Sequence, residues 1–393
     1  MNNEPMALRL IVGLSGGVDS AVAALLLVRA GHEVHGLHMS NWEEDEAGHC
    51  NAAADFQAAQ SVADELGIPL HRVSFAAEYR ERVFADFLSA YAAGRTPNPD
   101  VLCNREVKFG ACLGYARRLG GQRLATGHYA RIDRSGSRPR LLRARDRAKD
   151  QCYFLQQVPA AALAAVEFPL GELTKSEVRE LARHAGLPVH DRPDSTGICF
   201  IGERPFREFL GRYLAAGPGP IETADGERLG LHDGLAFHTI GQRHGLKIGG
   251  RAGYPEAPWY VAAKDLARNA LVVVQGHEHP LLMAGAFEVE QVAWLAAPTG
   301  ASLACSVQVR HRSAEVPCRV AIDGARVAVA PQAPIRALAA GQYAAFFAGE
   351  ECLGGGVITA VQTAVTPPGT AAAGLRAAPA AATTRTPAAA RAN

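Results

Sequence analysis

The chain has 393 residues, of which 48% are hydrophobic and 20% charged, so it is too long for one ordinary core and predicts a globular protein of two or three domains. No apolar run approaches the ~20 residues of a membrane span and the N-terminus lacks a secretory signal, so we expect no membrane contact and a cytoplasmic protein whose eight cysteines stay reduced. The formal net charge of +1 excludes a strong overall field, so any nucleic-acid contact must rest on a local basic patch.

The first third of the chain alternates short apolar runs with amphipathic segments. The apolar runs predict buried strands, and apolar residues at helical spacing between them predict helices. This alternation predicts an α/β domain with an open, mainly parallel sheet that binds its ligands at the carboxyl ends of the strands. The predicted strands are residues 8–14, 33–39, 70–75 and 123–130, and the predicted helices are residues 18–31, 52–66 and 78–93.

The rest of the chain changes character twice. Thr174 and Glu177 form a capping-box pattern that predicts a helix start, and Gly186 marks the helix end. After about residue 210 the sequence becomes rich in glycine and short strand-like runs, which predicts a small β-rich central domain followed by a C-terminal β-barrel. The expected domains are residues 6–209, 210–280 and 281–362, followed by an Ala-rich tail, 363–393, that has no acidic residue and is expected to be disordered.

Residues 13–20 (GLSGGVDS) join the first predicted strand to the first predicted helix. Bare backbone N–H groups and a helix N-terminus meet at such a turn and form an anion site, to which Ser15 and Ser20 can add hydroxyl donors. Asp19 would repel the anion, and a bridging Mg²⁺ ion would resolve that conflict. The loop lacks the lysine of a Walker A motif. The alternative interpretation is a tight turn without a ligand.

Two cysteines differ from the other six in lying within polar, turn-rich loops. Cys103 follows a loop that Pro97 and Pro99 make rigid, and Cys199 lies in the stretch DSTGICFIGER. The other six cysteines are interpreted as small buried hydrophobic residues. A thiol that acts as a nucleophile needs a lowered pKa, and His128 is the candidate base or cation, with a purely structural histidine as the alternative.

A basic segment spans residues 131–150. It contains seven arginines and one lysine against three aspartates, a local excess of +5. Such a cluster is typical of an RNA-binding surface, and a solvated hairpin is the alternative interpretation. A second basic cluster, Arg310, His311 and Arg312, lies in the predicted β-barrel.

The loop SGGVDS resembles the pyrophosphatase loop of N-type ATP pyrophosphatases, which cleave ATP between its α and β phosphates and adenylate a substrate oxygen. Over roughly residues 8–361 the chain resembles the family of tRNA-specific 2-thiouridylases, on the stretches GRTPNPDVLCN, TGHYAR, KDQCYFL, DSTGICFIGER, HTIGQRHGL and CLGGGVI. The resemblance implies that sulfur replaces oxygen at carbon 2 of the wobble uridine after adenylation has made that oxygen a leaving group with AMP. It also implies ATP with Mg²⁺ as cofactors. The implied partners are the tRNAs for Lys, Glu and Gln and a persulfide donor, either a cysteine desulfurase or a relay protein.

The same resemblance assigns roles to individual residues. Cys199 accepts the persulfide sulfur, Cys103 acts as the nucleophile and forms a disulfide with Cys199, and Asp100 is the third catalytic residue. The residues implied in ATP binding are Gly13, Leu14, Ser15, Gly16, Gly17, Val18, Asp19, Ser20, Met39 and Gly127, with Asp19 facing Mg²⁺. The target base is expected to contact Asn98, Pro99 and Asp100. The residues implied in tRNA binding are His128, Lys149, Asp150, Gln151, Arg310, His311 and Gln342.

Two rival functions use the same features. The first is an ATP-dependent amide-forming synthetase. Such an enzyme would need a source of ammonia, and we recognise no glutaminase-like domain in the sequence. The second is a redox-switched RNA-binding protein in which Cys103 and Cys199 form a regulatory disulfide. The identity of the nucleotide product separates these functions, because thiolation predicts AMP and pyrophosphate.

Overall fold

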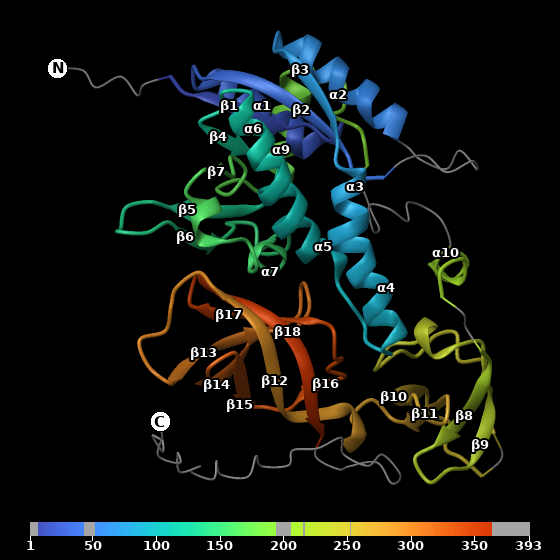
Figure 1. Cartoon of the computed structure of the whole chain (residues 1–393). Helices are drawn as coiled ribbons and strands as arrows, with labels where there is room; N and C mark the ends of the chain where they lie inside the picture. The colour runs from blue at the N-terminus through green and yellow to red at the C-terminus, as the bar shows by residue number, and fades with distance from the viewer. Residues whose placement is uncertain (1–6, 43–51, 194–205, 215–216, 252, 364–393) are drawn as a thin grey trace, which may run out of the picture.

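The computed structural model describes residues 7–42, 52–193, 206–214, 217–251 and 253–363. Its first part is a fully parallel five-stranded sheet with the order β3-β2-β1-β4-β7 (Figure 1). The predicted parallel α/β sheet is therefore confirmed. Its strands are β1 (Arg9–Gly13), β2 (Glu33–Ser40), β3 (Leu70–Ser74), β4 (Arg123–Ala125) and β7 (Val166–Glu167).

Helices cover both faces of this sheet because alternate residues of β1 point to opposite sides. Leu10 and Val12 pack in the cluster that contains α1, α2 and α9, and Ile11 packs in the cluster that contains the helices between residues 76 and 118. The helices of this part are α1 (Val18–Arg29), α2 (Ala52–Leu66), α3 (Ala76–Tyr79), η1 (Arg80–Phe84), α4 (Ala85–Ala92), α5 (Pro99–Leu102), η2 (Cys103–Ala111), α6 (Cys112–Arg118), α7 (Cys152–Leu155), α8 (Ala160–Leu163), α9 (Lys175–His184) and α10 (Phe206–Gly211).

The strand predicted over residues 123–130 is shorter than expected. β4 ends at Ala125, and the chain resumes as β5 (Ala130–Asp133), which belongs to a different sheet. The cause lies at Gly127, where a Cβ atom would stand 2.8 Å from the backbone of Asp19 and of Ser20. The close approach to the start of α1 needs a glycine there.

The central domain is a four-stranded sheet with the order β10-β11-β8-β9, in which only β8 and β11 run parallel. Its small core gathers apolar residues of all four strands around Trp259. The elements are β8 (Gly219–Thr223), β9 (Arg228–His232), η3 (Leu235–Phe237), β10 (Trp259–Asp265), β11 (Ala270–Gln275) and η4 (Pro280–Leu282).

The C-terminal part is the expected β-barrel, closed where β12 pairs with β18. The glycines of CLGGGVI explain how β18 fits there, because a Cβ atom at Gly356 would lie 2.5 Å from the Glu290 carbonyl oxygen of β12. The hairpin of β5 and β6 (Arg140–Arg143) extends this sheet from β18. The barrel elements are β12 (Met283–Trp294), β13 (Ser302–Gln308), β14 (Val316–Asp323), β15 (Arg326–Pro331), β16 (Ile335–Arg336), β17 (Tyr343–Ala348) and β18 (Glu351–Thr363).

Two expectations concern the limits of the chain. The tail expected to be disordered lies outside the described residues from 364 onward, and its state stays a prediction. Among the described residues, no helix combines the length and the apolar character that crossing a membrane requires.

Candidate active site

The GLSGGVDS loop places an open helix N-terminus at the carboxyl end of β1. Gly17 is the N-cap of α1 and supplies no side-chain cap, so no side chain claims the first amide groups of the helix. Gly16 has φ +82°, and a Cβ atom there would lie 2.5 Å from the Asp55 carbonyl oxygen. The hydroxyls of Ser15 and Ser20 lie 3.2 Å apart, and Ser20 donates to the Gly17 carbonyl at 3.0 Å. The loop therefore has the donor arrangement of an anion cradle, with both hydroxyls already oriented, and anion binding itself stays a prediction.

Contacts from elsewhere in the same domain hold the loop in place. The Arg192 guanidinium donates to the Gly16 carbonyl at 2.8 Å and also forms an ion pair with Asp55 of α2. Gly127 packs against the backbone of Asp19 from the other side. The loop is thus fixed by α2, by the segment after β4 and by the segment after α9.

Asp19 has two partners that the sequence analysis did not anticipate. Lys175 Nζ lies 2.6 Å from Asp19 Oδ1, and the Tyr129 hydroxyl donates to the same oxygen at 2.9 Å. The capping box of Thr174 and Glu177 is present and makes Lys175 the first residue of α9, which explains its position. The ammonium of Lys175 supplies positive charge beside the cradle, so the charge conflict at Asp19 has a solution within the chain, besides the Mg²⁺ ion expected from the sequence.

The carboxyl end of β2 lies between this cradle and Cys103. Met39 is half-buried near the end of β2, and the side-chain amide of Asn41 donates to Cys103 Sγ at 3.9 Å. Asn41 Oδ1 is buried and has no hydrogen-bond partner among the described residues. His38 is buried beside the Leu14 carbonyl, 2.9 Å from its Nδ1, and burial lowers its pKa. An open acceptor and a thiol therefore lie together at the strand end.

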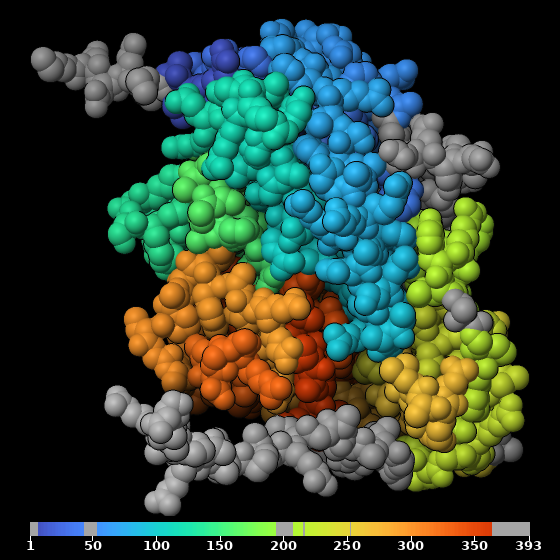
Figure 2. Space-filling view, viewed as in Figure 1, coloured from blue at the N-terminus to red at the C-terminus, as the bar shows by residue number. Residues whose placement is uncertain are grey.

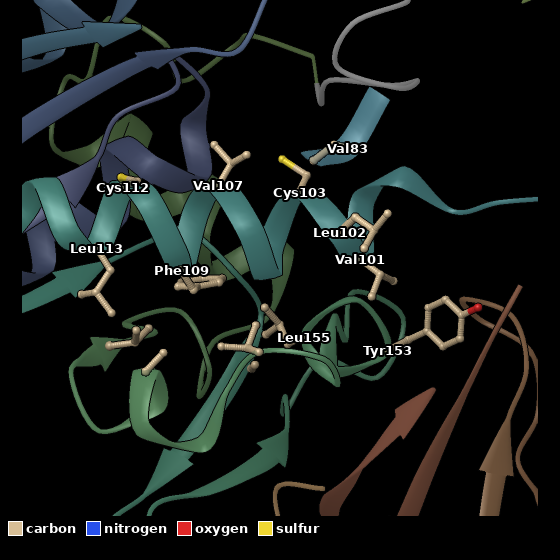
Figure 3. Close-up of a cluster of buried hydrophobic side chains, with 14 of the residues drawn as sticks. Val83, Val101, Leu102, Cys103, Val107, Phe109, Cys112, Leu113, Tyr153 and Leu155 are labelled. Carbon is tan, nitrogen blue, oxygen red and sulfur yellow. The ribbon is translucent and has the colours of Figure 1, made fainter. Parts of the chain in front are cut away.

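Cys103 lies in a helical run that spans residues 99–118 (Figure 3). The run begins at Asn98, whose side-chain oxygen accepts the Asp100 N–H at 3.2 Å, with proline at the first helical position. Cys103 itself is 2% exposed. Asp100 lies one turn earlier on the same run, and burial raises the pKa of its carboxyl against the lowering effect of Lys108. The expected base-contacting residues and the expected nucleophile thus occupy one helix start.

The segment before this helix is held by the two other domains. Gln342 donates its side-chain amide to the Thr96 carbonyl at 2.8 Å, and Lys264 of β10 donates to the Gly94 carbonyl at 3.1 Å. A Cβ atom at Gly341 would lie 2.9 Å from the Thr96 nitrogen, so the barrel approaches at backbone distance. Figure 2 shows the first, central and barrel parts of the molecule in contact at the lower end of the first part. In the structure Gln342 holds the loop that leads into the expected base-contacting residues, and its expected contact with tRNA stays a prediction.

His128 does not supply the positive charge considered for it. Its Nδ1 lies 2.8 Å from the Thr126 hydroxyl, and its ring packs against Phe109 and Phe168. Burial, aided by the positive charge of Lys108, lowers the pKa of His128 well below its usual value. These contacts favour the structural interpretation of His128, and its roles as a base or cation for the thiol and in tRNA binding stay predictions.

The arginines of the basic segment 131–150 form ion pairs with carboxylates, and the expected contact of this segment with RNA stays a prediction. Arg131 and Arg147 both form ion pairs with Glu350, and the buried Arg143 forms ion pairs with Asp150 and Glu315. These carboxylates include barrel residues far away in the sequence, so the arginines join the hairpin to the barrel. Further pairs join Arg134 to Glu167, Arg138 to Glu351, Arg140 to Asp133 and Glu351, and Arg145 to Glu177.

Lys149, Asp150 and Gln151 differ in what they can offer to RNA. Asp150 is buried, and its two oxygens accept from the Arg143 guanidinium at 2.6 Å and from a backbone N–H at 2.8 Å. Gln151 accepts the Tyr129 N–H at 2.9 Å. Asp150 and Gln151 therefore shape the loop around Lys149, and their direct contact with tRNA stays a prediction.

A groove of about 820 Å³ brings the two predicted RNA-binding segments together. Its lining includes Arg147 and Lys149 of the basic segment and Arg312 of the barrel loop, together with the carboxylates of Glu315 and Glu350. Basic side chains from residues 131–150 and from the barrel loop therefore face one hollow. Contact of this hollow with a phosphate backbone stays a prediction.

The barrel loop that carries Arg310 and His311 is anchored to its surroundings. The Arg310 guanidinium donates to the Ala337 carbonyl. The His311 ring lies 4.6 Å from the Phe154 ring, and burial lowers the pKa of His311. The loop is thus built onto the helix α7 segment, and its contact with tRNA stays a prediction.

Cys199 lies outside the described residues, so its distance from Cys103 is not part of the structure. Its loop is bounded by two tethered arginines. Arg192 contacts the Gly16 carbonyl, and Arg207 of α10 forms an ion pair with Asp233 of the central domain. Among the described residues there is no cluster of three or more His, Cys, Asp or Glu side chains that could hold a metal ion.

Four functional candidates were missed at the level of the sequence: Asn41, Tyr129, Lys175 and Arg192. Tyr129 lies within TGHYAR, which was recognised only as a family motif. Lys175 follows the capping threonine of α9, so the capping box fixed its place on the helix but not its neighbour 156 residues away. The signal in the sequence that could have indicated Lys175 is its position as a charged residue at the start of a helix next to the sheet.

Comparisons with known proteins cover nearly the whole described chain. Family models described as "tRNA methyl transferase HUP domain", "tRNA methyl transferase PRC-barrel domain" and "Aminomethyltransferase beta-barrel domain" match residues 8–203, 207–275 and 284–358. A solved U34-tRNA thiolase, NcsA from Methanococcus maripaludis, is 18% identical, with 52% of this chain and 63% of that chain covered. Its TM-score of 0.33 is too low to carry an argument.

Curated relatives settle the family. The tRNA-specific 2-thiouridylase MnmA of Alkalilimnicola ehrlichii is 53% identical over 354 residues, which are 89% of this chain and 97% of the relative. The protein of the same name from Escherichia coli O1:K1 is 52% identical over 356 residues, 90% of this chain and 97% of the relative. On this identity and coverage, the chain belongs to the MnmA family of tRNA-specific 2-thiouridylases.

Proposed function

We propose that this chain catalyses the ATP-dependent 2-thiolation of the wobble uridine of tRNA, with release of AMP and pyrophosphate. The relatives' name, tRNA-specific 2-thiouridylase, gives the class of reaction. The observation that carries the proposal is that the end of β2 joins an anion cradle to a thiol. The cradle is the open start of α1 with Lys175 beside it, and Asn41 at the strand end donates to Cys103.

The cradle fits the polyphosphate of ATP. Uncapped helix amides, the hydroxyls of Ser15 and Ser20 and the ammonium of Lys175 offer donors and positive charge to a phosphate group. Bound ATP supplies an adenylate on the uracil oxygen, which then leaves with AMP. The half-buried Met39 would contact the adenine. Asp19 would hold Mg²⁺ together with ATP phosphates, as a single carboxylate can.

Asn98, Pro99 and Asp100 would receive the flipped uridine at the start of the helix that carries Cys103. Burial raises the pKa of Asp100, and its carboxyl would hydrogen-bond to the base at this helix start. An anticodon loop exposes unstacked bases, so the flipping has a modest cost. The unpaired oxygen of Asn41 offers an acceptor for a base N–H next to the thiol.

Sulfur transfer would use both cysteines. The Cys103 thiolate attacks the Cys199 sulfur of a Cys199 persulfide, which forms the Cys103–Cys199 disulfide and releases hydrosulfide. Hydrosulfide attacks carbon 2 of the adenylated uridine, and AMP leaves with the former carbonyl oxygen. A thiol reductant then returns both cysteines to thiols, so each turnover consumes one persulfide sulfur and two electrons. The two Cα atoms must come within about 4.4–6.8 Å in the disulfide state.

The partners follow from the same family. We infer that the substrates are the tRNAs for Lys, Glu and Gln, that a cysteine desulfurase or a relay protein delivers the sulfur, and that the protein works in the cytoplasm. The groove beside Lys149 and Arg312 supports contact with the tRNA backbone. Methyl transfer, which the family models name, is favoured by no contact described above.

The test is to incubate the protein with tRNA, ATP, a cysteine desulfurase and cysteine, and to measure nucleotide products and tRNA nucleosides by mass spectrometry. We expect AMP, pyrophosphate and 2-thiouridine. Cys103→Ser should abolish 2-thiouridine, whereas Cys112→Ala, a buried cysteine on the same helical run, should keep it. ADP as the product, or thiolation by Cys103→Ser, would contradict the proposal. An RNA-binding protein with a redox switch would make no 2-thiouridine at all.

A further inference from the structure

Two cysteines of the barrel that play no part in the proposed reaction face each other across a hairpin. Cys305 of β13 is directly paired with Cys318 of β14, and their sulfur atoms lie 3.6 Å apart. Residues directly opposite in an antiparallel pair have Cα atoms about 4.5–5.5 Å apart, which falls within the range of a disulfide. A small rotation of the side chains would therefore bring the two sulfurs to bonding distance.

The two thiols also differ in exposure and in pKa, as the attacking and resolving thiols of a reactive pair do. Cys305 is partly exposed, whereas Cys318 is only 4% exposed. The contact between the thiols lowers the pKa of Cys305 and raises that of Cys318. Solvent can thus reach Cys305, the more acidic thiol. The buried Cys318 thiol is placed to act as the resolving thiol that attacks an oxidised Cys305 sulfur.

The pair lies at the base of the loop that carries Arg310 and His311. Only two register pairs, Ser306 with Pro317 and Val307 with Val316, separate it from the loop. A hydrogen bond within the loop stabilises it, because the Ser313 hydroxyl donates to the Arg310 carbonyl at 2.8 Å. A covalent bond at this place would fix both strands on which the loop stands.

We propose that Cys305 and Cys318 are a redox-active dithiol that a hydroperoxide converts reversibly to a cross-strand disulfide, which stiffens the barrel loop 309–315. The Cys305 thiolate attacks the peroxide oxygen, which gives a sulfenic acid and releases water or an alcohol. The Cys318 thiol attacks the Cys305 sulfur and expels water, so two electrons pass from the thiols to the peroxide. A dithiol reductant restores both thiols. Formation of the disulfide does not depend on the proposed thiolation, and only its meaning for RNA contact rests on that function.

Mass spectrometry of the full chain tests the bond directly. Hydrogen peroxide is added, free thiols are blocked, and the protein is digested with trypsin without reduction. Cleavage after Arg310, Arg312 and Arg319 leaves Cys305 and Cys318 as single cysteines of separate peptides, 269–310 and 313–319. We expect these peptides to be linked after oxidation and separate after reduction. The fully buried Cys152 and Cys352 should be unmodified in the same sample.

A second measurement reports the mechanical effect. Hydrogen–deuterium exchange at amides 309–315 should slow about tenfold after oxidation of the wild type. Cys318→Ser is the matched control, since it keeps the size of the side chain but should show no change with peroxide. Absence of the linked peptides, or slowing of the same size in Cys318→Ser, would overturn the proposal. If the linked peptides form but the protein does not thiolate tRNA, the redox proposal is supported and only the proposed function is contradicted.

Discussion

Two loops of the candidate site are held in opposite ways. The GLSGGVDS loop is fixed by side chains of its own domain, with Arg192 on its backbone and Lys175 on Asp19. The loop 94–97 is fixed at its backbone by side chains of the two other domains, Lys264 and Gln342. The proposed phosphate end of the site is therefore held within one domain, whereas the proposed base end depends on how three domains dock.

This contrast separates two kinds of defect. Damage to the phosphate loop should stop adenylation itself, because the donors that face the leaving group are lost. Damage to the docking contacts should leave nucleotide binding intact and misplace the base relative to Cys103.

Replacement of Lys175 should have the largest effect. Lys175→Ala removes a positive charge beside the anion cradle, and loss of one such donor commonly costs about 10²–10³ in rate. We expect pyrophosphate release in the presence of tRNA to fall by about that factor, measured with a coupled pyrophosphate assay. Arg183→Ala, at the exposed far end of α9, is the matched control and should behave as wild type. A rate close to wild type in Lys175→Ala would show that Lys175 only balances the charge of Asp19.

The sequence predicted well what neighbouring residues determine. The strand–loop–helix order around Gly16, the capping box at Thr174 and the hairpin-rich barrel all depend on contacts within a few residues, or on the period of the apolar pattern. The shortened strand β4 was missed because the close approach of Gly127 to Asp19 is a tertiary contact.

The charges of the site escaped prediction for the same reason. The excess of +5 in residues 131–150 was counted correctly, but Glu350 and Glu315, which neutralise part of it, lie about 165–220 residues further along the chain. Lys175 is likewise 156 residues from Asp19. A count along the sequence does not reveal which opposite charges the fold brings together.

Replacement of Gln342 distinguishes two roles for this residue: positioning of the loop 94–97 and direct contact with tRNA. Gln342→Ala removes the hydrogen bond to the Thr96 carbonyl and leaves that carbonyl without this donor. We expect kcat for thiolation to fall about tenfold with little change in the Kd for tRNA, measured by filter binding. Gln332→Ala, an exposed residue of the same barrel, is the control. A loss of tRNA affinity with kcat unchanged would instead support the direct RNA contact expected from the sequence.

Lys264 should have the smallest effect on activity and a distinctive dependence on pH. Lys264→Met keeps the aliphatic stem but loses the bond to the Gly94 carbonyl, so we expect about a two- to fivefold fall in kcat. Burial lowers the pKa of Lys264 to about 8, whereas the unfolded lysine titrates near 10.4. Between these values the unfolded state binds more protons, so this lysine's contribution to the free energy of unfolding rises with pH.

The pH effect can be isolated by comparing the two proteins. Wild type should gain thermal stability relative to Lys264→Met as the pH rises from about 7 to 10, because the buried charge that destabilises the fold below pH 8 is lost. His238, the nearby imidazole, has its pKa lowered to about 4 by burial and stays neutral throughout this window. A stability difference that does not change with pH would mean that the ammonium is solvated, and that docking at Gly94 does not bury its charge.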